Sequence, residues 1–250
     1  MIHSFLLIGQ SNMAGRGRLD EAMDVDKTHI KTLRNGRWVK MFRPINPDRS
    51  FSGVSLAESF AERYAQKYGV DVGLICCADG GTRLEQWAEG SILFDNAVSQ
   101  AKLAMRSSTI EGVLWHQGEA DCAKELSATY EMRFVKVMNA LRNTLGLHDI
   151  PFLLGGLGDF LPNHTENEHL VHYQDVNEAL LKIAQNNPMT GFVPAHGLGA
   201  NEDNLHFSAK ALYEFGQRYF DVYETVRRPD RAVTEKVLED CGPRSAMELL

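Results

Sequence analysis

A serine stands at the point where the first apolar run of the chain ends. The run from Phe5 to Ile8 is followed by Gly9-Gln10-Ser11-Asn12-Met13. Ligands of open parallel sheets bind beyond the carboxyl ends of the strands, so Ser11 is a candidate nucleophile at the mouth of a site. A serine here also fits a plain structural role as a helix N-cap. The pattern departs from Gly-x-Ser-x-Gly, because position 13 is Met.

A free hydroxyl is a weak nucleophile at neutral pH and needs a base. The chain offers one near its carboxyl end, in Asp203-Asn204-Leu205-His206-Phe207-Ser208, just ahead of a helical segment. An Asp three residues before a His can accept the Nδ1–H of the imidazole, which leaves Nε2 to take the serine proton. The alternative is that Asp203 or Ser208 is a cap and His206 is merely exposed.

Two further segments carry hydrogen-bond donors suited to the negative oxygen of an acyl-transfer intermediate. Ala78-Asp79-Gly80-Gly81-Thr82-Arg83 and Trp115-His116-Gln117-Gly118-Glu119 each follow a predicted strand. A glycine N–H and a glutamine side-chain amide are donors of the required kind. Taken alone, Gly80-Gly81 also fits an ordinary turn and Gln117 an ordinary polar side chain.

Two clusters contain residue types that bind metals. At the end of a strand, His-x-x-Glu does not place both side chains on one face, so we expect no metal site in the first cluster, His116, Glu119, Asp121 and Cys122. The second is expected to be a solvated loop and helix start, formed by His164, Glu166, His169 and His172. Three tryptophans could stack on a sugar or belong to the core, and Trp87 is the best placed of Trp38, Trp87 and Trp115.

Short apolar runs alternate with longer segments of helical periodicity, which predicts a three-layer α/β/α sandwich around a five-stranded parallel, flavodoxin-like sheet. The predicted strands are Ser4–Gly9, Val70–Cys77, Gly112–His116, Phe152–Gly156 and Gly191–Val193. The predicted helices are Leu56–Tyr68, Asp95–Ser107, Ala128–Leu145, Glu168–Gln185 and Ala209–Val226. Between Arg16 and Ser52, Asn35-Gly36 predicts a hairpin, in an excursion over the active face.

Composition narrows the classes of partner. The net charge is −7 and the basic residues are scattered, which argues against nucleic acid. No apolar stretch approaches the roughly 20 residues that span a membrane, and no export signal is visible, so we expect a cytoplasmic enzyme.

We expect one domain over residues 1–226 and a tail over 227–250 with weak helical character at 232–238. The cysteines are expected to be reduced, and a homo-oligomer is compatible with the sequence.

The four segments, in this order, resemble the SGNH hydrolase superfamily. Within it they are most similar to the carbohydrate esterase branch of acetylxylan esterases and sialate O-acetylesterase-like proteins. The resemblance covers residues 4 to about 215 and implies the SGNH hydrolase fold. It also implies roles for single residues: Ser11 as nucleophile and first oxyanion donor, Gly80 and Gln117 as further oxyanion donors, and His206 as base.

The acid that partners His206 has two candidates. Asp203 fits the Asp-x-x-His pattern of the family, whereas Glu119 is expected to support the site by binding loop amides. The expected reaction is removal of O-acetyl groups from a mono- or oligosaccharide through an acetyl-serine, without a cofactor. Two alternatives are a lysophospholipase or thioesterase on the same scaffold, and a glycan-binding module without activity.

Overall fold

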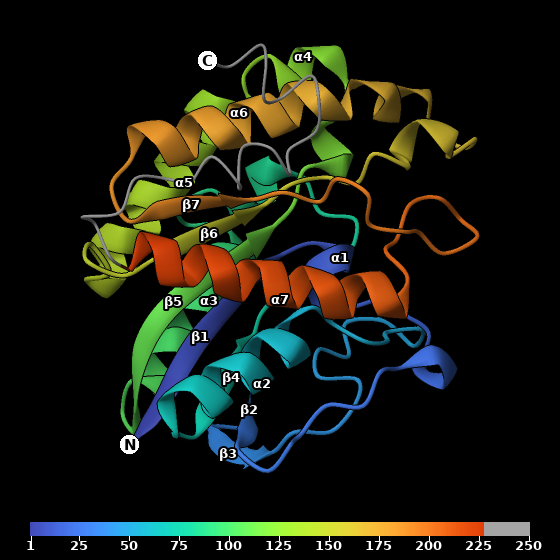
Figure 1. Ribbon diagram of the computed structural model, residues 1–250. Helices are drawn as coiled ribbons and strands as arrows, with labels where there is room; N and C mark the ends of the chain where they lie inside the picture. Colours follow the sequence, from blue (N-terminus) through green and yellow to red (C-terminus); the bar gives the residue numbers. More distant parts are fainter. Residues whose placement is uncertain (228–250) are drawn as a thin grey trace.

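The computed structural model describes residues 1–227 and contains a seven-stranded sheet in the order β3-β2-β4-β1-β5-β6-β7 (Figure 1). The strands are β1 Ile2–Gly9, β2 Ile30–Arg34, β3 Arg37–Lys40, β4 Val72–Cys76, β5 Ser108–His116, β6 Phe152–Gly155 and β7 Thr190–Val193. Every neighbouring pair is parallel except β2 and β3, which are antiparallel. The mostly parallel sheet is confirmed.

The prediction of five strands was wrong, because the hairpin joins the sheet as β2 and β3. The turn is where the sequence places it, with Asn35 and Gly36 both at positive φ, 48° and 72°. Strand β2 pairs in parallel with β4, and its Ile30 and Thr32 are buried. The hairpin therefore extends the sheet edge instead of lying over the active face. Local turn chemistry identifies a hairpin, but it does not identify the strand beside which the hairpin will pack.

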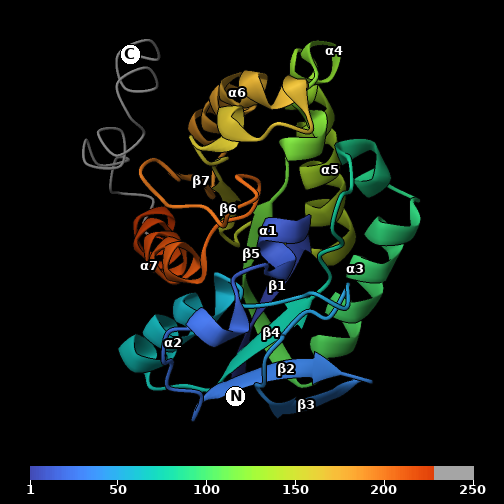
Figure 2. The ribbon, with the colours of Figure 1, turned by 90° about the vertical axis from the view of Figure 1, so that its right-hand side faces the viewer.

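Helices cover both faces of the sheet, as expected for a three-layer sandwich. Figure 2 shows α2 and α7 on one side and α3 and α5 on the other, and α6 packs against α5 and β7. The helices are α1 Ser11–Ala14, α2 Ala57–Tyr68, α3 Ile92–Ala104, α4 Lys124–Ser127, α5 Tyr130–Leu145, α6 Tyr173–Asn186 and α7 Ala209–Val226. Five short 3₁₀ segments are η1 Leu19–Glu21, η2 Leu84–Trp87, η3 Glu119–Asp121, η4 Leu161–Asn163 and η5 Glu168–His172.

Aromatic packing anchors the helix pair α2 and α7 on the central strand. The Phe5 ring of β1 makes edge contacts with Phe60 and Tyr64 of α2, both at 4.8 Å between centroids. Gly216 lets α7 approach α2 closely, since an added Cβ would lie 2.0 Å from the carbonyl oxygen of Leu56. Helix α7 is thereby held beside β1, and its amino end lies near the carboxyl ends of the strands.

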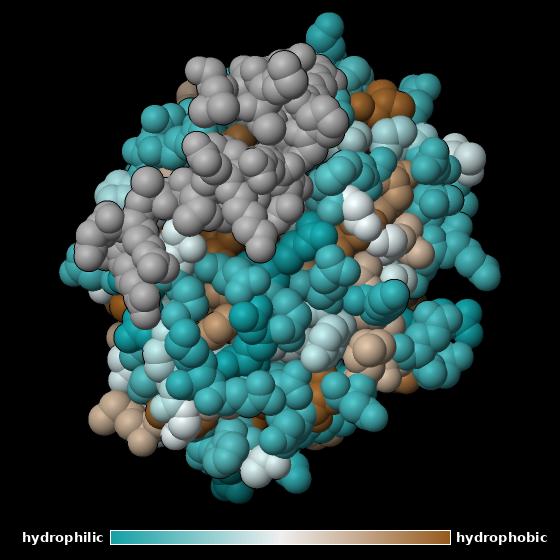
Figure 3. All heavy atoms as spheres, viewed as in Figure 1, coloured by the Kyte–Doolittle hydropathy of each residue, from teal (hydrophilic) through white to brown (hydrophobic). Residues whose placement is uncertain are grey.

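The surface shows no single extended hydrophobic region on the face seen in Figure 3, where hydrophobic residues are scattered among hydrophilic ones. Within residues 1–227, no helix is both long enough and apolar enough to cross a membrane. Apart from Arg227, the expected tail at 227–250, with its helical stretch at 232–238, lies outside the described residues.

Candidate active site

The end of β1 is shaped to present Ser11. Gly9 has φ +131°, and an added Cβ would lie 2.0 Å from the carbonyl oxygen of His116 in the neighbouring strand β5, so only glycine fits. The next residue, Gln10, donates its N–H to that same oxygen at 2.8 Å. Ser11 then opens the short helix α1, with 6% of the residue exposed.

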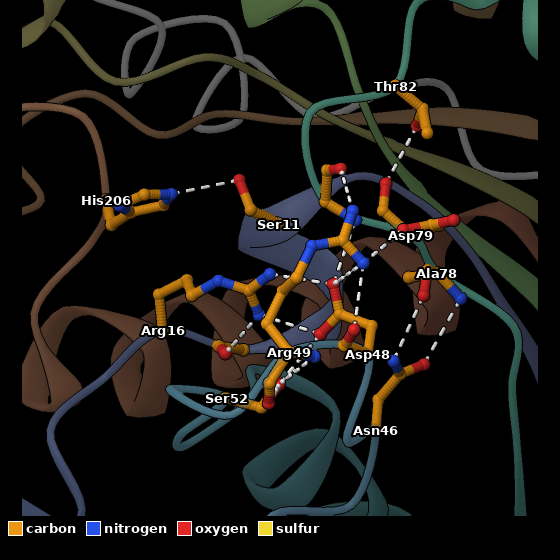
Figure 4. A network of polar contacts seen from close by, with 12 residues as sticks. Ser11, Arg16, Asn46, Asp48, Arg49, Ser52, Ala78, Asp79, Thr82 and His206 are labelled. Carbon is orange, nitrogen blue, oxygen red and sulfur yellow. Dashed lines mark hydrogen bonds and ion pairs between the residues drawn. The ribbon is translucent and has the colours of Figure 1, made fainter.

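The structure brings Ser11 and His206 together from opposite ends of the chain. His206 Nε2 lies 3.0 Å from Ser11 Oγ, and Figure 4 shows the ring directed at this hydroxyl. On the other side of the ring, Nδ1 lies 2.7 Å from Asp203 Oδ2. The sequence predicts all three residues, and here they form one hydrogen-bonded chain that ends at a carboxylate.

Asp203 is held by its own loop. Its Oδ1 accepts the backbone N–H groups of Leu205 and His206, both at 2.9 Å. Burial by itself would raise the pKa of Asp203, but the hydrogen bonds from the His206 ring and from these two N–H groups lower it to about 2. The carboxylate is therefore ionised at neutral pH and holds the imidazole in one orientation.

Glu119 does not touch His206. Its Oε1 accepts from Asn12 Nδ2 at 2.5 Å and lies 3.2 Å from His116 Nε2. Burial would raise the pKa of Glu119, but the His116 charge and the hydrogen bonds from His116 and Asn12 lower it. The partners of Glu119 are thus two side chains, Asn12 and His116, and not the loop amides that the sequence suggests.

Two of the three expected oxyanion donors, Gly80 and Gln117, already make hydrogen bonds within the protein. Gly80 N–H donates to Asp48 Oδ2 at 2.9 Å. Gln117 is fully buried, and its Nε2 donates to the Thr82 carbonyl at 3.0 Å and to Asp121 Oδ2 at 2.7 Å. Among residues 1–227, the structure gives the Ser11 N–H no acceptor. In this structure the Ser11 N–H is therefore the free donor, whereas the N–H groups of Gly80 and Gln117 are engaged by other acceptors.

A buried ion pair that sequence reasoning missed lies beside Gly80. Arg16 and Asp48 form two hydrogen bonds, at 3.0 and 2.7 Å, with only 4% and 6% of their side chains exposed (Figure 4). Burial would raise the pKa of Asp48, but Arg16, the Ser52 hydroxyl and the Gly80 N–H lower it. No spacing in the sequence links position 16 to position 48, so the pair has no local signal.

A polar pocket of about 330 Å³ adjoins this ion pair. It is formed by the ends of β2 and β4, the segment 45–49 and the start of α3; its lining residues are Leu33, Arg34, Ile45, Asn46, Pro47, Asp48, Arg49, Cys76, Cys77, Ala78, Asp79, Leu93 and Asn96. Arg49 binds the loop that follows β4, through Asp79 Oδ1 at 2.9 Å and the Gly80 carbonyl at 2.9 Å.

Of the two roles left open for Trp87, the structure shows the core position and not an exposed sugar-stacking face. Only 1% of Trp87 is exposed, because η2 turns the ring inward against Trp115, 5.6 Å away, and its Nε1 donates to Thr82 Oγ1. Phe51 is the exposed aromatic residue of this region, 68% exposed and stacked over the Arg16 guanidinium. In the part of the chain that the structure describes, no three His, Cys, Asp or Glu side chains are grouped as metal ligands.

A mostly parallel sheet with helices on both faces is the fold of SGNH hydrolases, and Ser11, His206 and Asp203 lie together beyond the carboxyl ends of its strands. The model of the sialic acid-specific acetylesterase family of carbohydrate esterases matches residues 1–225. The chain belongs to this family, and it is therefore a carboxylic ester hydrolase.

Individual relatives agree with this assignment. A probable carbohydrate esterase of Arabidopsis thaliana is 26% identical over 245 residues, which cover 88% of this chain and 89% of the relative. A crystal structure of the Arabidopsis protein has a TM-score of 0.78 and covers 89% of this chain and 97% of its own. The structure of NanS shares the fold, with a TM-score of 0.70, 17% identity and coverage of 89% and 96%.

Proposed function

We propose that this enzyme removes O-acetyl groups from carbohydrates through an acetyl-serine intermediate on Ser11. The observation that carries the proposal is the hydrogen-bonded chain from Ser11 Oγ through His206 to Asp203, at 3.0 and 2.7 Å. Family membership supports a carbohydrate ester as the substrate. A hydroxyl at the edge of a sheet, next to an oriented imidazole, is the arrangement that acyl transfer requires.

The reaction has two halves. First, His206 Nε2 takes the proton of Ser11 Oγ while the oxygen attacks the acetyl carbonyl carbon. The intermediate collapses as the carbon–oxygen bond to the sugar breaks, and His206 returns the proton to the leaving sugar oxygen. Water then gives a proton to His206 Nε2 and attacks the acetyl carbon of the acetyl-serine. The bond between this carbon and Ser11 Oγ breaks, His206 returns the proton to Oγ, and acetate is released. Asp203 stabilises the imidazolium in both halves.

The negative oxygen of each intermediate first meets the Ser11 N–H, the free donor at the amino end of α1. Gly80 and Gln117 join as the second and third donors when they exchange Asp48 and Asp121 for the oxyanion. Each such donor is worth about 10²–10³ in rate. The proposal thus includes a rearrangement of the hydrogen bonds that Gly80 and Gln117 make in this structure.

The test compares wild type with Ser11→Ala on an aryl acetate and on acetylated xylo-oligosaccharides and O-acetyl sialic acid, with released acetate as the readout. Ser11→Ala should abolish turnover while the circular dichroism spectrum stays unchanged. Wild-type enzyme should be labelled at Ser11 by an organophosphonate. Undiminished activity in the variant would end the proposal.

Two competing functions are separated by the same assays. A lysophospholipase or thioesterase would prefer longer acyl chains when aryl esters from acetate to octanoate are compared. A glycan-binding module without activity would neither turn over aryl acetates nor react with the organophosphonate. We expect preference for acetate, because the site is bordered by polar and charged side chains such as Asp48 and Arg49.

A further inference from the structure

The side chain of the residue after the proposed nucleophile forms hydrogen bonds with the backbone on both sides of the proposed base. Asn12 is 1% exposed in α1. Its Oδ1 accepts the N–H of Phe207 at 3.1 Å, and its Nδ2 donates to the carbonyl of Leu205 at 3.2 Å. These two backbone groups flank His206 directly. One side chain therefore ties the loop that carries the imidazole to the helix that carries the hydroxyl.

The orientation of this amide is determined by its neighbours. A carboxylate can only accept and a backbone N–H can only donate, so Nδ2 must face Glu119 and Oδ1 must face Phe207. Glu119 is in turn held by His116, whose ring is fully buried and makes edge contacts with Phe207 and Phe215. The amide thus has one hydrogen-bonded arrangement, which the buried contact between Glu119 and His116 supports.

Other contacts of the loop hold it less directly. Asp203 Oδ1 and the bond from Asn201 N–H to the His206 carbonyl, at 2.7 Å, lie within the loop itself. Asn201 Nδ2 donates to the Arg16 carbonyl at 3.0 Å, which ties the start of the loop to the segment after α1. His164 reaches the Asp203 carbonyl at 2.7 Å. Asn12 is the side chain that links the two residues flanking His206 to the helix of Ser11.

We propose that Asn12 is a positioning residue, whose side-chain amide, oriented by Glu119, holds His206 at proton-transfer distance from Ser11. This inference rests on the function proposed above for Ser11 and His206. Ser11 and Asn12 are neighbours in the chain, so the Ser11 hydroxyl and the Asn12 side-chain amide move together. The distance between nucleophile and base then does not depend on the exposed part of the loop. A misplacement of a reacting group by 1 Å costs about 10²-fold in rate.

The central experiment compares Asn12→Ala with a matched control, Asn177→Ala. Asn177 clamps the backbone of Leu157 in the same manner, with Oδ1 at 2.7 Å from its N–H and Nδ2 at 3.1 Å from its carbonyl. Asn12→Ala should lower kcat on an aryl acetate by about 10²-fold with little change in KM, and should slow organophosphonate labelling of Ser11 by a similar factor. Asn177→Ala should lower the melting temperature but leave both rates near wild type.

A second pair of variants tests the orientation of the amide and serves if Asn12→Ala does not fold. Asn12→Asp alone places a second carboxylate against Glu119 and should lose at least as much kcat as Asn12→Ala. In the double variant Asn12→Asp with Glu119→Gln, the Gln amide can donate to the new Asp carboxylate. We expect kcat of the double variant to be about tenfold higher than that of Asn12→Asp alone. Glu119→Gln on its own should cost less than Asn12→Ala, because the side-chain oxygen of Gln can still accept from Asn12 Nδ2.

The outcomes separate this inference from the proposed function. If Ser11→Ala is inactive while Asn12→Ala has the kcat and labelling rate of Asn177→Ala, the positioning role is wrong and the esterase mechanism stands. The positioning role is also wrong if Asn12→Asp shows no recovery when Glu119→Gln is added. If Ser11→Ala retains full activity, the mechanism itself fails, and the inference about Asn12 fails with it.

Discussion

Replacing Asp203 by Asn decides whether this carboxylate is the partner of His206. One oxygen of Asp203 accepts two backbone N–H groups at 2.9 Å, and the other accepts from the imidazole Nδ1 at 2.7 Å. In Asp203→Asn, the amide oxygen must face the two N–H donors, so the amide NH₂ faces the ring. Nδ1 then has to accept, and the ring proton moves to Nε2, which cannot take the proton of Ser11.

The expected magnitude follows from this change of tautomer. An imidazole held in the wrong tautomer costs about 10⁴ in kcat for a Ser-His-Asp site. That factor corresponds to about 5.4 kcal/mol in the activation free energy, at about 1.36 kcal/mol for each factor of ten. We expect a loss of about 10³–10⁴-fold in kcat with KM nearly unchanged, because the lost interaction acts in the transition state.

The assay measures kcat and KM on an aryl acetate for wild type, Asp203→Asn and the matched carboxylate-to-amide control Glu119→Gln. Glu119 contacts Asn12 and His116 but not His206, so its variant should lose less than about tenfold. An unchanged circular dichroism spectrum would show that both variants keep the native fold. Asp203→Asn within about tenfold of wild type, or a larger loss in Glu119→Gln, would refute this assignment of the acid.

Two further predictions concern stability. Arg16→Met leaves Asp48 as a buried charge without its partner, and should lower the free energy of unfolding, measured by urea denaturation, by about 3–5 kcal/mol. Adding Asp48→Leu should recover part of this loss, and a smaller loss in the single variant than in the double variant would contradict the reasoning. The folded-state pKa of Asp203, about 2, lies below its unfolded value of 3.8, so its contribution to stability is present above pH 4 and lost as the pH falls toward 2. Because 44% of this side chain is exposed, solvent screening reduces that contribution to about 1 kcal/mol. The difference in unfolding free energy between wild type and Asp203→Asn should therefore be largest near neutral pH and shrink as the pH falls through about 2, and a difference that grows on acidification would contradict the sign.

The fold class and the central residues of the site follow from the sequence because their signals are local. Alternating apolar runs and helical periodicity predict the parallel sheet, and the carboxyl ends of β1 and β7 then bring Ser11 and His206 to one edge. The spacing of Asp203 and His206 within one tight loop predicts their contact. Sequence reasoning fails at the edge of the sheet, where β2 and β3 extend the five predicted strands to seven. It fails there because β2 pairs with β4, which lies about 40 residues away in the chain.

The donors and supports of the site were decided by tertiary structure. Gly80 and Gln117 are the residue types that an oxyanion requires, yet Asp48 and Asp121 occupy their N–H groups, and those acceptors come from distant segments. Asn12 stands beside Ser11 in the chain, but its partners at Leu205 and Phe207 are some 190 residues away. A sequence determines which groups can donate or accept at each position. Which partner satisfies a buried group depends on the packing that excludes water from it, and packing is a property of the folded chain.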